Sequence, residues 1–287
     1  MKLVRFGPAG KEEAGCIDCE GNIRALRGRV PDITPDWLES SRLNSLCALD
    51  PASLPIVTSA VRLGPCIAGV GKFICVGLNF TDHAEEAGMA IPKEPILFMK
   101  PTSAIGGPED DVELPRGATK GDWEVELGVI IGTGGKYIEE AQAMDHVAGY
   151  CVINDLSERA FQMEGTGQWM KGKSADGFGP IGPWLVTADE IRDPHNLMMW
   201  LDVNGTRYQD GNSGNMIRRI PYLISYISNF MSLAPGDVIA TGTPAGVGMG
   251  QKPPVYLKPG DLIELGIDGL GTQRQRILAW DRGLKSA

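Results

Sequence analysis

Short apolar segments separated by glycine and proline dominate the chain from Ile67 onward, and they limit what it can fold into. The sequence of 287 residues contains 38 glycines and 20 prolines. Both residue types interrupt helices but are frequent in the turns that join short strands. The pattern therefore predicts a mixed, β-rich α+β fold rather than a doubly wound α/β sheet.

The order of these segments suggests two units. Residues 1–65 are typical of a small β-rich unit with a turn at residues 20–22, a short helix near residues 35–46 and a linker at residues 50–55. Residues 66–287 would form a larger unit. In that unit we expect helices over residues 81–88, 138–144 and 217–231, the last from apolar residues at three- and four-residue spacing.

Charge and composition exclude several kinds of partner. The net charge of -9 and the lack of a basic block argue against binding to nucleic acid or anionic membranes. No apolar stretch is long enough for a membrane span, and the first residues lack a signal-peptide core, so we expect a cytoplasmic protein. We expect the six cysteines to be reduced thiols, with Cys16-Ile17-Asp18-Cys19 at a hairpin turn rather than in a zinc or redox motif.

Three carboxylates lie in or next to apolar, strand-like segments. Glu124 and Glu126 precede a run of β-branched residues, and Asp155 follows the segment 150–154. Alternate residues of a strand share a face, so the two glutamates point the same way. Acidic side chains rarely enter such strands unpaired, and their oxygens suit a hard cation such as Mg²⁺, Mn²⁺ or Ca²⁺. We interpret this as a metal site. A solvated strand face is the alternative, and Asp122 would be either a further ligand or a rim charge.

A histidine and a glutamate follow the apolar strand over residues 73–77. His83 and Glu86 are three residues apart, so on a helix they share a face, and Thr81 or Asp82 could cap that helix. A carboxylate in this position can orient the imidazole and raise its basicity, which predicts half of a catalytic dyad. The other histidines, His146 and His195, are expected to be structural or exposed.

Two glycine-rich segments invite a ligand-binding interpretation. Gly167, Gly172, Lys173 and Ser174 satisfy the spacing of a P-loop, but no buried strand precedes them and the glycines and prolines that follow cannot open a helix. We therefore regard the match as accidental. In the segment over residues 241–248, backbone N–H groups and threonine hydroxyls could hold a carboxylate, with a plain tight turn as the alternative.

Taken together, these segments resemble the fumarylacetoacetate hydrolase superfamily over residues 70–280. No single segment is specific, but all of them in this order are. The resemblance rests on residues 77–80 with His83 and Glu86, residues 95–101, the Glu124-Val125-Glu126-Leu127-Gly128 strand, Asn154-Asp155, Lys173-Ser174, and residues 241–248. The first 65 residues resemble only the longer bacterial members.

The resemblance implies a β-sandwich-like or roll fold, a homodimer and a catalytic unit over residues 66–287. It also implies bound Mg²⁺ or Mn²⁺ and a keto-acid substrate. The residues that it implies are three metal ligands (Glu124, Glu126 and Asp155), a catalytic dyad with a lysine (His83, Glu86 and Lys173), and three substrate contacts (Arg159, Gln162 and Thr243).

The reaction that such a site implies is hydrolysis of a 2,4-diketo acid held on the metal through its carboxylate and 2-keto oxygen. His83, oriented by Glu86, would deprotonate a water that attacks the 4-keto carbon. Cleavage of the C3–C4 bond would leave pyruvate enolate beside the metal and Lys173. The same site could also support decarboxylation or keto–enol isomerisation.

The tract over residues 173–184 most resembles bacterial 2,4-diketo-3-deoxy-L-rhamnonate hydrolases, which release pyruvate and L-lactate in sugar-acid degradation. Alternative activities on the same metal site are an oxaloacetate-type decarboxylase, a 2-hydroxyhepta-2,4-diene-1,7-dioate isomerase and a ureidoglycolate lyase. A keto-acid-binding protein without turnover fits less well, because binding alone does not require the His83–Glu86 pair.

Overall fold

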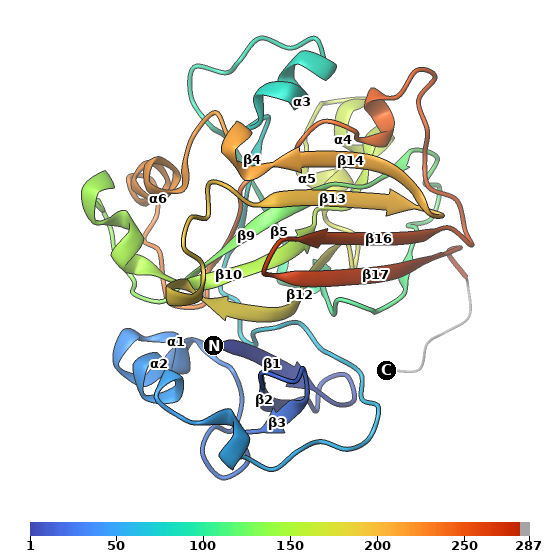
Figure 1. Cartoon of the computed structure of the whole chain (residues 1–287). Coiled ribbons are helices and arrows are strands. Elements are labelled where there is room, and N and C mark those ends of the chain that lie inside the picture. Colours follow the sequence, from blue (N-terminus) through green and yellow to red (C-terminus); the bar gives the residue numbers. More distant parts are fainter. Residues whose placement is uncertain (282–287) are drawn as a thin grey trace.

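The structure, a computed structural model, describes residues 1–281 and has the mixed, strand-rich α+β fold that the sequence predicts (Figure 1). Residues 282–287, the end of the expected 66–287 unit, lie outside the described residues. Two large sheets and one two-stranded sheet make up the strands. Among residues 1–281, no helix has the length and apolar character needed to cross a membrane.

The larger sheet has ten strands and runs through the whole molecule. Its order is β3 (Ile23–Ala25), β2 (Glu13–Ile17), β1 (Lys2–Phe6), β12 (Gly179–Thr187), β10 (Val147–Asn154), β9 (Val125–Ile131), β15 (Val238–Ala240), β4 (Phe73–Gly77) and β5 (Ile96–Lys100), with β6 (Ile105–Gly106) paired to β12. The expected strand over residues 73–77 is therefore β4.

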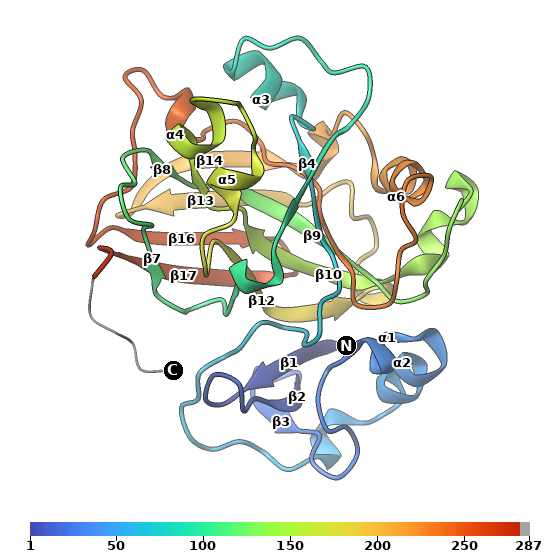
Figure 2. The ribbon, with the colours of Figure 1, turned by 180° about the vertical axis from the view of Figure 1, so that it is seen from behind.

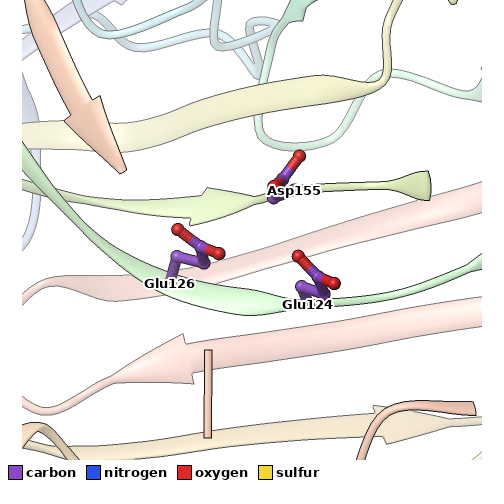
Figure 3. A group of neighbouring side chains, drawn as sticks. All are labelled: Glu124, Glu126 and Asp155. Atoms are coloured by element: carbon purple, nitrogen blue, oxygen red, sulfur yellow. The ribbon is translucent and has the colours of Figure 1, made fainter. Parts of the chain in front are cut away.

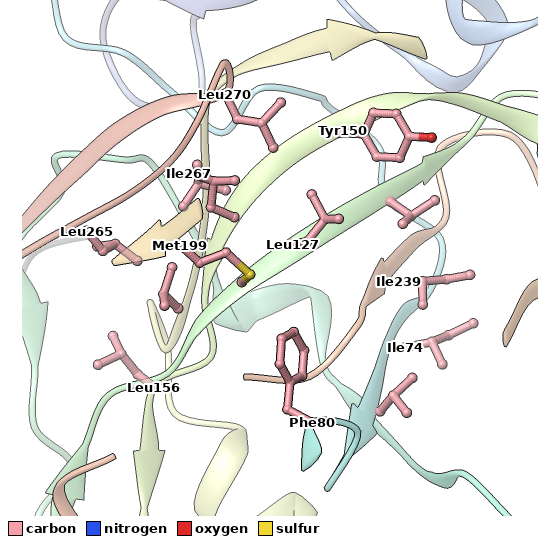
Figure 4. Close-up of a cluster of buried hydrophobic side chains, with 14 of the residues drawn as sticks. Ile74, Phe80, Leu127, Tyr150, Leu156, Met199, Ile239, Leu265, Ile267 and Leu270 are labelled. Carbon is pink, nitrogen blue, oxygen red and sulfur yellow. The ribbon is translucent and has the colours of Figure 1, made fainter. Parts of the chain in front are cut away.

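The second sheet packs on one face of the first. Its order is β14 (Thr206–Asn212), β13 (Met198–Val203), β16 (Leu262–Ile267), β17 (Gly271–Leu278) and β7 (Val112–Glu113), while β8 (Gly121–Asp122) and β11 (Ser157–Glu158) form the two-stranded sheet. Figure 4 shows Leu127 of β9, Tyr150 of β10 and Leu265 of β16 in one buried cluster. Burial of apolar side chains between the sheets is the main source of stability here.

The N-terminal unit continues the larger sheet instead of standing apart from it (Figures 1 and 2). β1 pairs with β12, with Leu3 opposite Leu185. A second buried cluster joins Leu3 to Cys151 of β10 and Ile130 of β9, on the face of the sheet away from Leu127. As expected, the segment from Cys16 to Cys19 leads into the β2–β3 hairpin turn, and all six cysteines are free thiols.

Helices are few and short, as the glycine and proline content predicts. They are α1 (Pro35–Leu38), α2 (Ser40–Cys47), α3 (Thr81–Glu86), α4 (Arg159–Met163), α5 (Met170–Lys173) and α6 (Ile220–Ser228). Single 3₁₀ turns cover Pro51–Ser53, Thr102–Ala104, Ala188–Glu190, Ser213–Asn215 and Gly248–Gly250, and a longer 3₁₀ segment covers Glu140–His146.

The structure corrects several expected helices. The helix near residues 35–46 is broken at Glu39, whose backbone (φ -59°, ψ 137°) is not helical. The helix expected over residues 138–144 is the 3₁₀ segment Glu140–His146, and the one over 217–231 is shortened to α6. The N-cap of α3 is Phe80, so the capping expected from Thr81 or Asp82 is wrong.

Strand direction places four chain segments at one edge of the larger sheet. β10 and β15 both run antiparallel to β9, and β4 runs parallel to β15. The carboxyl ends of β4, β10 and β15 therefore meet the amino end of β9. The segments that leave these ends carry α3, Asp155 and residues 241–248, which is how residues far apart in sequence reach one site.

Candidate metal centre and active site

Glu124, Glu126 and Asp155 converge where β9 begins and β10 ends (Figure 3). The β9–β10 register places Ile153 opposite Glu126, and the Asp155 N–H donates to the Glu124 carbonyl at 2.9 Å. One ligand oxygen from each carboxylate lies within 4.8 Å of the others, and all three residues are buried. The alternative of a solvated strand face is therefore wrong, because these acids point into the protein.

Lys173, the last residue of α5, neutralises two of these carboxylates. Its Nζ lies 2.7 Å from Glu124 Oε2 and 2.7 Å from Asp155 Oδ2. Burial alone raises the pKa of Glu124, but the charges of Lys173 and Arg159 outweigh it and lower the pKa to about 2. Burial likewise lowers the pKa of Lys173, and the two carboxylates outweigh that effect and raise it. Glu124 is thus held as a carboxylate and Lys173 as an ammonium.

Lys100, at the end of β5, is a further member of the site that the sequence analysis did not identify as functional. Its buried ammonium donates to three backbone carbonyls, those of Leu156 (3.0 Å), Lys173 (2.8 Å) and Phe178 (2.9 Å). It also lies 2.6 Å from Asp155 Oδ1. A charged residue that ends an apolar strand was the available signal, but only the tertiary structure shows its partners.

Two features of the carboxylates fit a bound divalent cation. Asp155 Oδ1 is buried and forms an ion pair with Lys100 at 2.6 Å, but the three protons of Lys100 have carbonyl acceptors, so this oxygen accepts no aligned hydrogen bond from residues 1–281. Burial, together with the charges of Asp155 and Glu124, raises the pKa of Glu126 well above its usual value. A cation among the three carboxylates would bind Asp155 Oδ1 and would offset the negative charges that raise the pKa of Glu126. Oxygen ligands suit Mg²⁺ or Mn²⁺.

Arg159 and Gln162, both on α4, lie next to the carboxylates. Arg159 Nη1 donates to Gln162 Oε1 at 2.9 Å, and Nη2 lies 2.6 Å from Glu124 Oε1. The guanidinium Nε donates to Asp122 Oδ2 at 2.8 Å. Arg159 and Gln162 therefore lie beside the candidate metal ligands.

Asp122 is neither a metal ligand of this cluster nor a rim charge, the two roles that the sequence left open. Its carboxylate is completely buried and accepts four hydrogen bonds. Oδ1 accepts from the backbone N–H groups of Trp123 (2.8 Å) and Gly248 (2.6 Å), and Oδ2 accepts from Met249 N–H (3.0 Å) and Arg159 Nε. Asp122 thereby joins the segment after β15 to the arginine of α4.

His83 and Glu86 face each other on α3, as the three-residue spacing predicts. His83 Nδ1 lies 3.3 Å from Glu86 Oε2, and Glu86 Oε1 accepts from the Gly246 N–H at 2.9 Å. If Nδ1 carries its proton toward Glu86, Nε2 is left as the basic nitrogen. Glu86 therefore holds the imidazole, and the backbone in turn holds Glu86.

The segment over residues 241–248 binds carboxylates, but those of the protein itself. Its N–H groups donate to Glu126 from Gly242 (2.8 Å), to Glu86 from Gly246 and to Asp122 from Gly248. The Thr243 hydroxyl donates to the Val125 carbonyl at 2.9 Å and accepts from Gln209 Nε2 at 2.7 Å. The alternative of a plain tight turn is thus wrong. Thr243 lines the pocket with its hydroxyl already engaged.

A single pocket contains most of the residues expected from the sequence. It is lined by the three carboxylates together with His83, Lys173, Arg159, Gln162 and Thr243. Glu86 lies behind His83 and does not line it. The pocket holds about 530 Å³ of empty space when the solvent at its open mouth is counted.

The residues expected to be structural lie elsewhere. His146 Nδ1 is 2.7 Å from the Thr133 carbonyl, and His195 Nε2 accepts from the Ile220 N–H at 3.2 Å. Lys173 ends α5 instead of preceding a helix, and its ammonium is held by carboxylates. The P-loop spacing is therefore accidental, as the sequence analysis concluded.

Comparisons with known proteins find matches over most of the chain. A sequence profile described as fumarylacetoacetate (FAA) hydrolase C-terminal matches residues 72–278. A Burkholderia multivorans protein with a provisional name of hydrolase is 57% identical over 276 residues, which is 96% of this chain and 98% of that protein.

Solved structures of related proteins match almost the whole chain. Fumarylacetoacetate hydrolase from Exiguobacterium antarcticum has a TM-score of 0.87 and 36% identity, covering 98% of this chain and 100% of its own. Maleylpyruvate hydrolase from Sphingobium sp. SYK-6, solved with manganese(II) and pyruvate, has a TM-score of 0.81 and 28% identity, covering 98% and 100%.

Proposed function

The chain belongs to the fumarylacetoacetate hydrolase family, and on that premise we propose that it is a metal-dependent enzyme that hydrolyses a carbon–carbon bond of a 2,4-diketo acid. The observation that carries the proposal is the convergence of Glu124, Glu126 and Asp155 in one pocket with His83. The pairing of a cation site with a supported imidazole is what hydrolysis of an activated keto acid requires.

Glu124, Glu126 and Asp155 would hold Mg²⁺ or Mn²⁺, which when bound would supply positive charge to polarise the 2-keto group of the acid. The neighbour from Sphingobium, whose structure contains manganese(II) and pyruvate, supports this choice of metal and of product. The buried Asp155 Oδ1, which pairs with Lys100 but accepts no aligned hydrogen bond from the described residues, supports the same site.

The chain's own residues would perform the proton transfers and hold the substrate. Glu86 fixes His83 through Nδ1, so Nε2 can take a proton from water as that water attacks the 4-keto carbon. The C3–C4 bond then breaks, the C4 fragment leaves as a carboxylic acid, and the electron pair of the bond forms the enolate of pyruvate, which takes up a proton to give pyruvate. Lys173 lies beside the carboxylates, where its ammonium can stabilise the enolate oxygen. Arg159 and Gln162 would hold the substrate carboxylate, next to Glu124.

The test is a panel of 2,4-diketo acids, oxaloacetate and ureidoglycolate, each incubated with Mg²⁺ or Mn²⁺ and followed by pyruvate release. We expect pyruvate from the diketo acids and its loss on addition of EDTA. Release of CO₂ from oxaloacetate, or a shifted double bond without uptake of water, would favour the decarboxylase or isomerase instead. Turnover that survives EDTA would refute the metal site.

Within that class, the tract over residues 173–184 favours 2,4-diketo-3-deoxy-L-rhamnonate, cleaved to pyruvate and L-lactate, and the panel includes this acid. We also propose that the enzyme acts in the cytoplasm as a homodimer, as the family resemblance implies. Light scattering of the purified protein measures its mass, and a monomer at micromolar concentration would contradict the dimer.

A further inference from the structure

Two groups of side chains line the pocket, a polar floor and an apolar wall. The polar floor consists of Glu124, Glu126, Asp155, His83, Lys173, Arg159, Gln162 and Thr243. Its charged residues are linked to one another and buried, with no lining carboxylate more than 6% exposed. Apart from Gln162 and Thr243, the other side chains of the lining are apolar except for the indole nitrogen of Trp169, and the larger ones are Leu78, Met89, Phe98, Met163, Trp169 and Met249. These six residues are called the apolar wall below.

The apolar wall begins next to the polar floor and ends at the solvent. The Phe98 ring centroid lies 5.3 Å from Lys173 Nζ, and the Trp169 ring packs edge-on against Phe98 with 5.6 Å between centroids. Met89 and Met163 are each 46% exposed, so they lie at the mouth. The wall therefore runs from the candidate reaction centre outward.

Gly77, the last residue of β4, fixes the position of the Trp169 ring. A Cβ at Gly77 would lie 2.2 Å from Trp169 Cζ3 and 2.9 Å from Cη2, so only glycine lets the six-membered ring lie against the strand. The edge of this ring that faces the strand is therefore hydrocarbon. The indole is thus held in place beside the floor, with its hydrocarbon edge against the strand.

The two long cationic side chains of the floor, Lys173 and Arg159, have little capacity left for a distant part of the substrate. Lys173 bonds Glu124 and Asp155, and the Arg159 guanidinium contacts Asp122, Glu124 and Gln162. A polar group at the far end of an acyl chain would lose water against the wall without gaining a charged partner, which is unfavourable. An apolar end would gain from burial.

We propose that the apolar wall receives the far end of the acyl group, so that the enzyme selects 2,4-diketo acids whose acyl group ends in apolar carbon. This inference rests on the proposed function, because it takes the keto-acid end to lie on the polar floor. The terminal methyl group of 2,4-diketo-3-deoxy-L-rhamnonate satisfies the rule, as do simple acylpyruvates.

The test compares two acids of the same shape, 7-methyl-2,4-dioxooctanoate and 6-carbamoyl-2,4-dioxohexanoate, which end in an isopropyl and a carboxamide group. We expect kcat/KM from pyruvate release to favour the isopropyl acid by about 10- to 100-fold. A ratio near one, or one that favours the amide, would overturn the proposal.

Variants at two methionines locate the effect. Met163→Gln should reduce the ratio at least about threefold by offering the amide a partner at the mouth. Met170→Gln is the matched control, since Met170 is 54% exposed but does not line the pocket, and it should keep the wild-type ratio. Equal ratios in both variants would remove Met163 from the wall. Turnover of 2,4-dioxopentanoate, which is too short to reach the mouth, reports whether each variant is folded.

A binding measurement distinguishes failure of the apolar-wall proposal from failure of the proposed function. Calorimetric titration of the two acids into His83→Ala protein gives their affinity ratio without turnover. If neither acid is cleaved by the wild type, the proposed function fails, while a preference for the isopropyl acid in binding would still support the wall. Equal affinities would refute the wall even if both acids are cleaved.

Discussion

Replacing Asp122 by asparagine tests whether this buried carboxylate holds the site together. The carboxylate has two oxygens, and each accepts two hydrogen bonds, from Trp123 and Gly248 on Oδ1 and from Arg159 and Met249 on Oδ2. An asparagine side chain keeps one oxygen and presents an NH₂ group in place of the other. Two of the four donors are therefore left without an acceptor, whichever way the amide is oriented.

The expected loss follows from that count. Each buried donor left unsatisfied costs about 1–3 kcal/mol, so Asp122→Asn should lower the free energy of unfolding by about 2–6 kcal/mol. That is a large share of the roughly 5–15 kcal/mol that keeps a typical domain folded. Because Arg159 is one of the donors, the KM for the keto acid should also rise.

Urea unfolding followed by tryptophan fluorescence measures the first effect, and pyruvate release measures the second. Asp111→Asn is the control, since it makes the same chemical change at an exposed position and should cost less than about 0.5 kcal/mol. If the Asp122 and Asp111 variants unfold at the same urea concentration, the four hydrogen bonds do not stabilise the site and the reasoning is wrong.

Three further predictions follow from other contacts. His83→Ala should reduce pyruvate release by at least about 100-fold while calorimetry shows unchanged Mn²⁺ binding, and unchanged turnover would rule out the dyad. Lys100→Met leaves three carbonyls without a donor and should cost at least about 3 kcal/mol in urea unfolding, so wild-type stability would contradict the role given to its ammonium. Burial raises the pKa of Asp18, but the hydrogen bonds from Arg24, Asn22 and Glu20 together outweigh it and lower the pKa from 3.8 to about 2. The stability that this carboxylate contributes is present above pH 4 and is lost as the pH falls toward 2. The wild type should therefore have a higher urea midpoint than Asp18→Asn at pH 5, and the two midpoints should converge at pH 2. A difference in midpoint that is the same at both pH values would refute the pairing.

The local pattern predicted the strands of the site but could not predict how they pair. Alternation along β9 correctly separates Glu126 from Val125 and Leu127, which pack against the second sheet. That Asp155 lies beside Glu124 depends on the antiparallel register of β9 and β10, and this register is set by burial on both faces of the sheet.

Lys100 and Asp122 show the limit of reasoning from sequence. Each is a charged residue at the edge of an apolar segment, where exposure and burial are equally compatible with the local pattern. Their partners come from three or more separate segments, so only the assembled structure shows that both are buried and satisfied. The break at Glu39 is similar, because the residues on either side of it have ordinary helical spacing.

The pairing of β1 with β12 has a consequence for how this protein could be shortened or recombined. Removing residues 1–65 would leave β12 as a bare sheet edge, with unpaired N–H and C=O groups opposite the former positions of Lys2 and Leu3. The same cut would uncover the apolar face around Ile130 and Cys151. Exposed edges of this kind recruit other chains and aggregate. The first 65 residues thus protect the catalytic sheet from association with copies of itself.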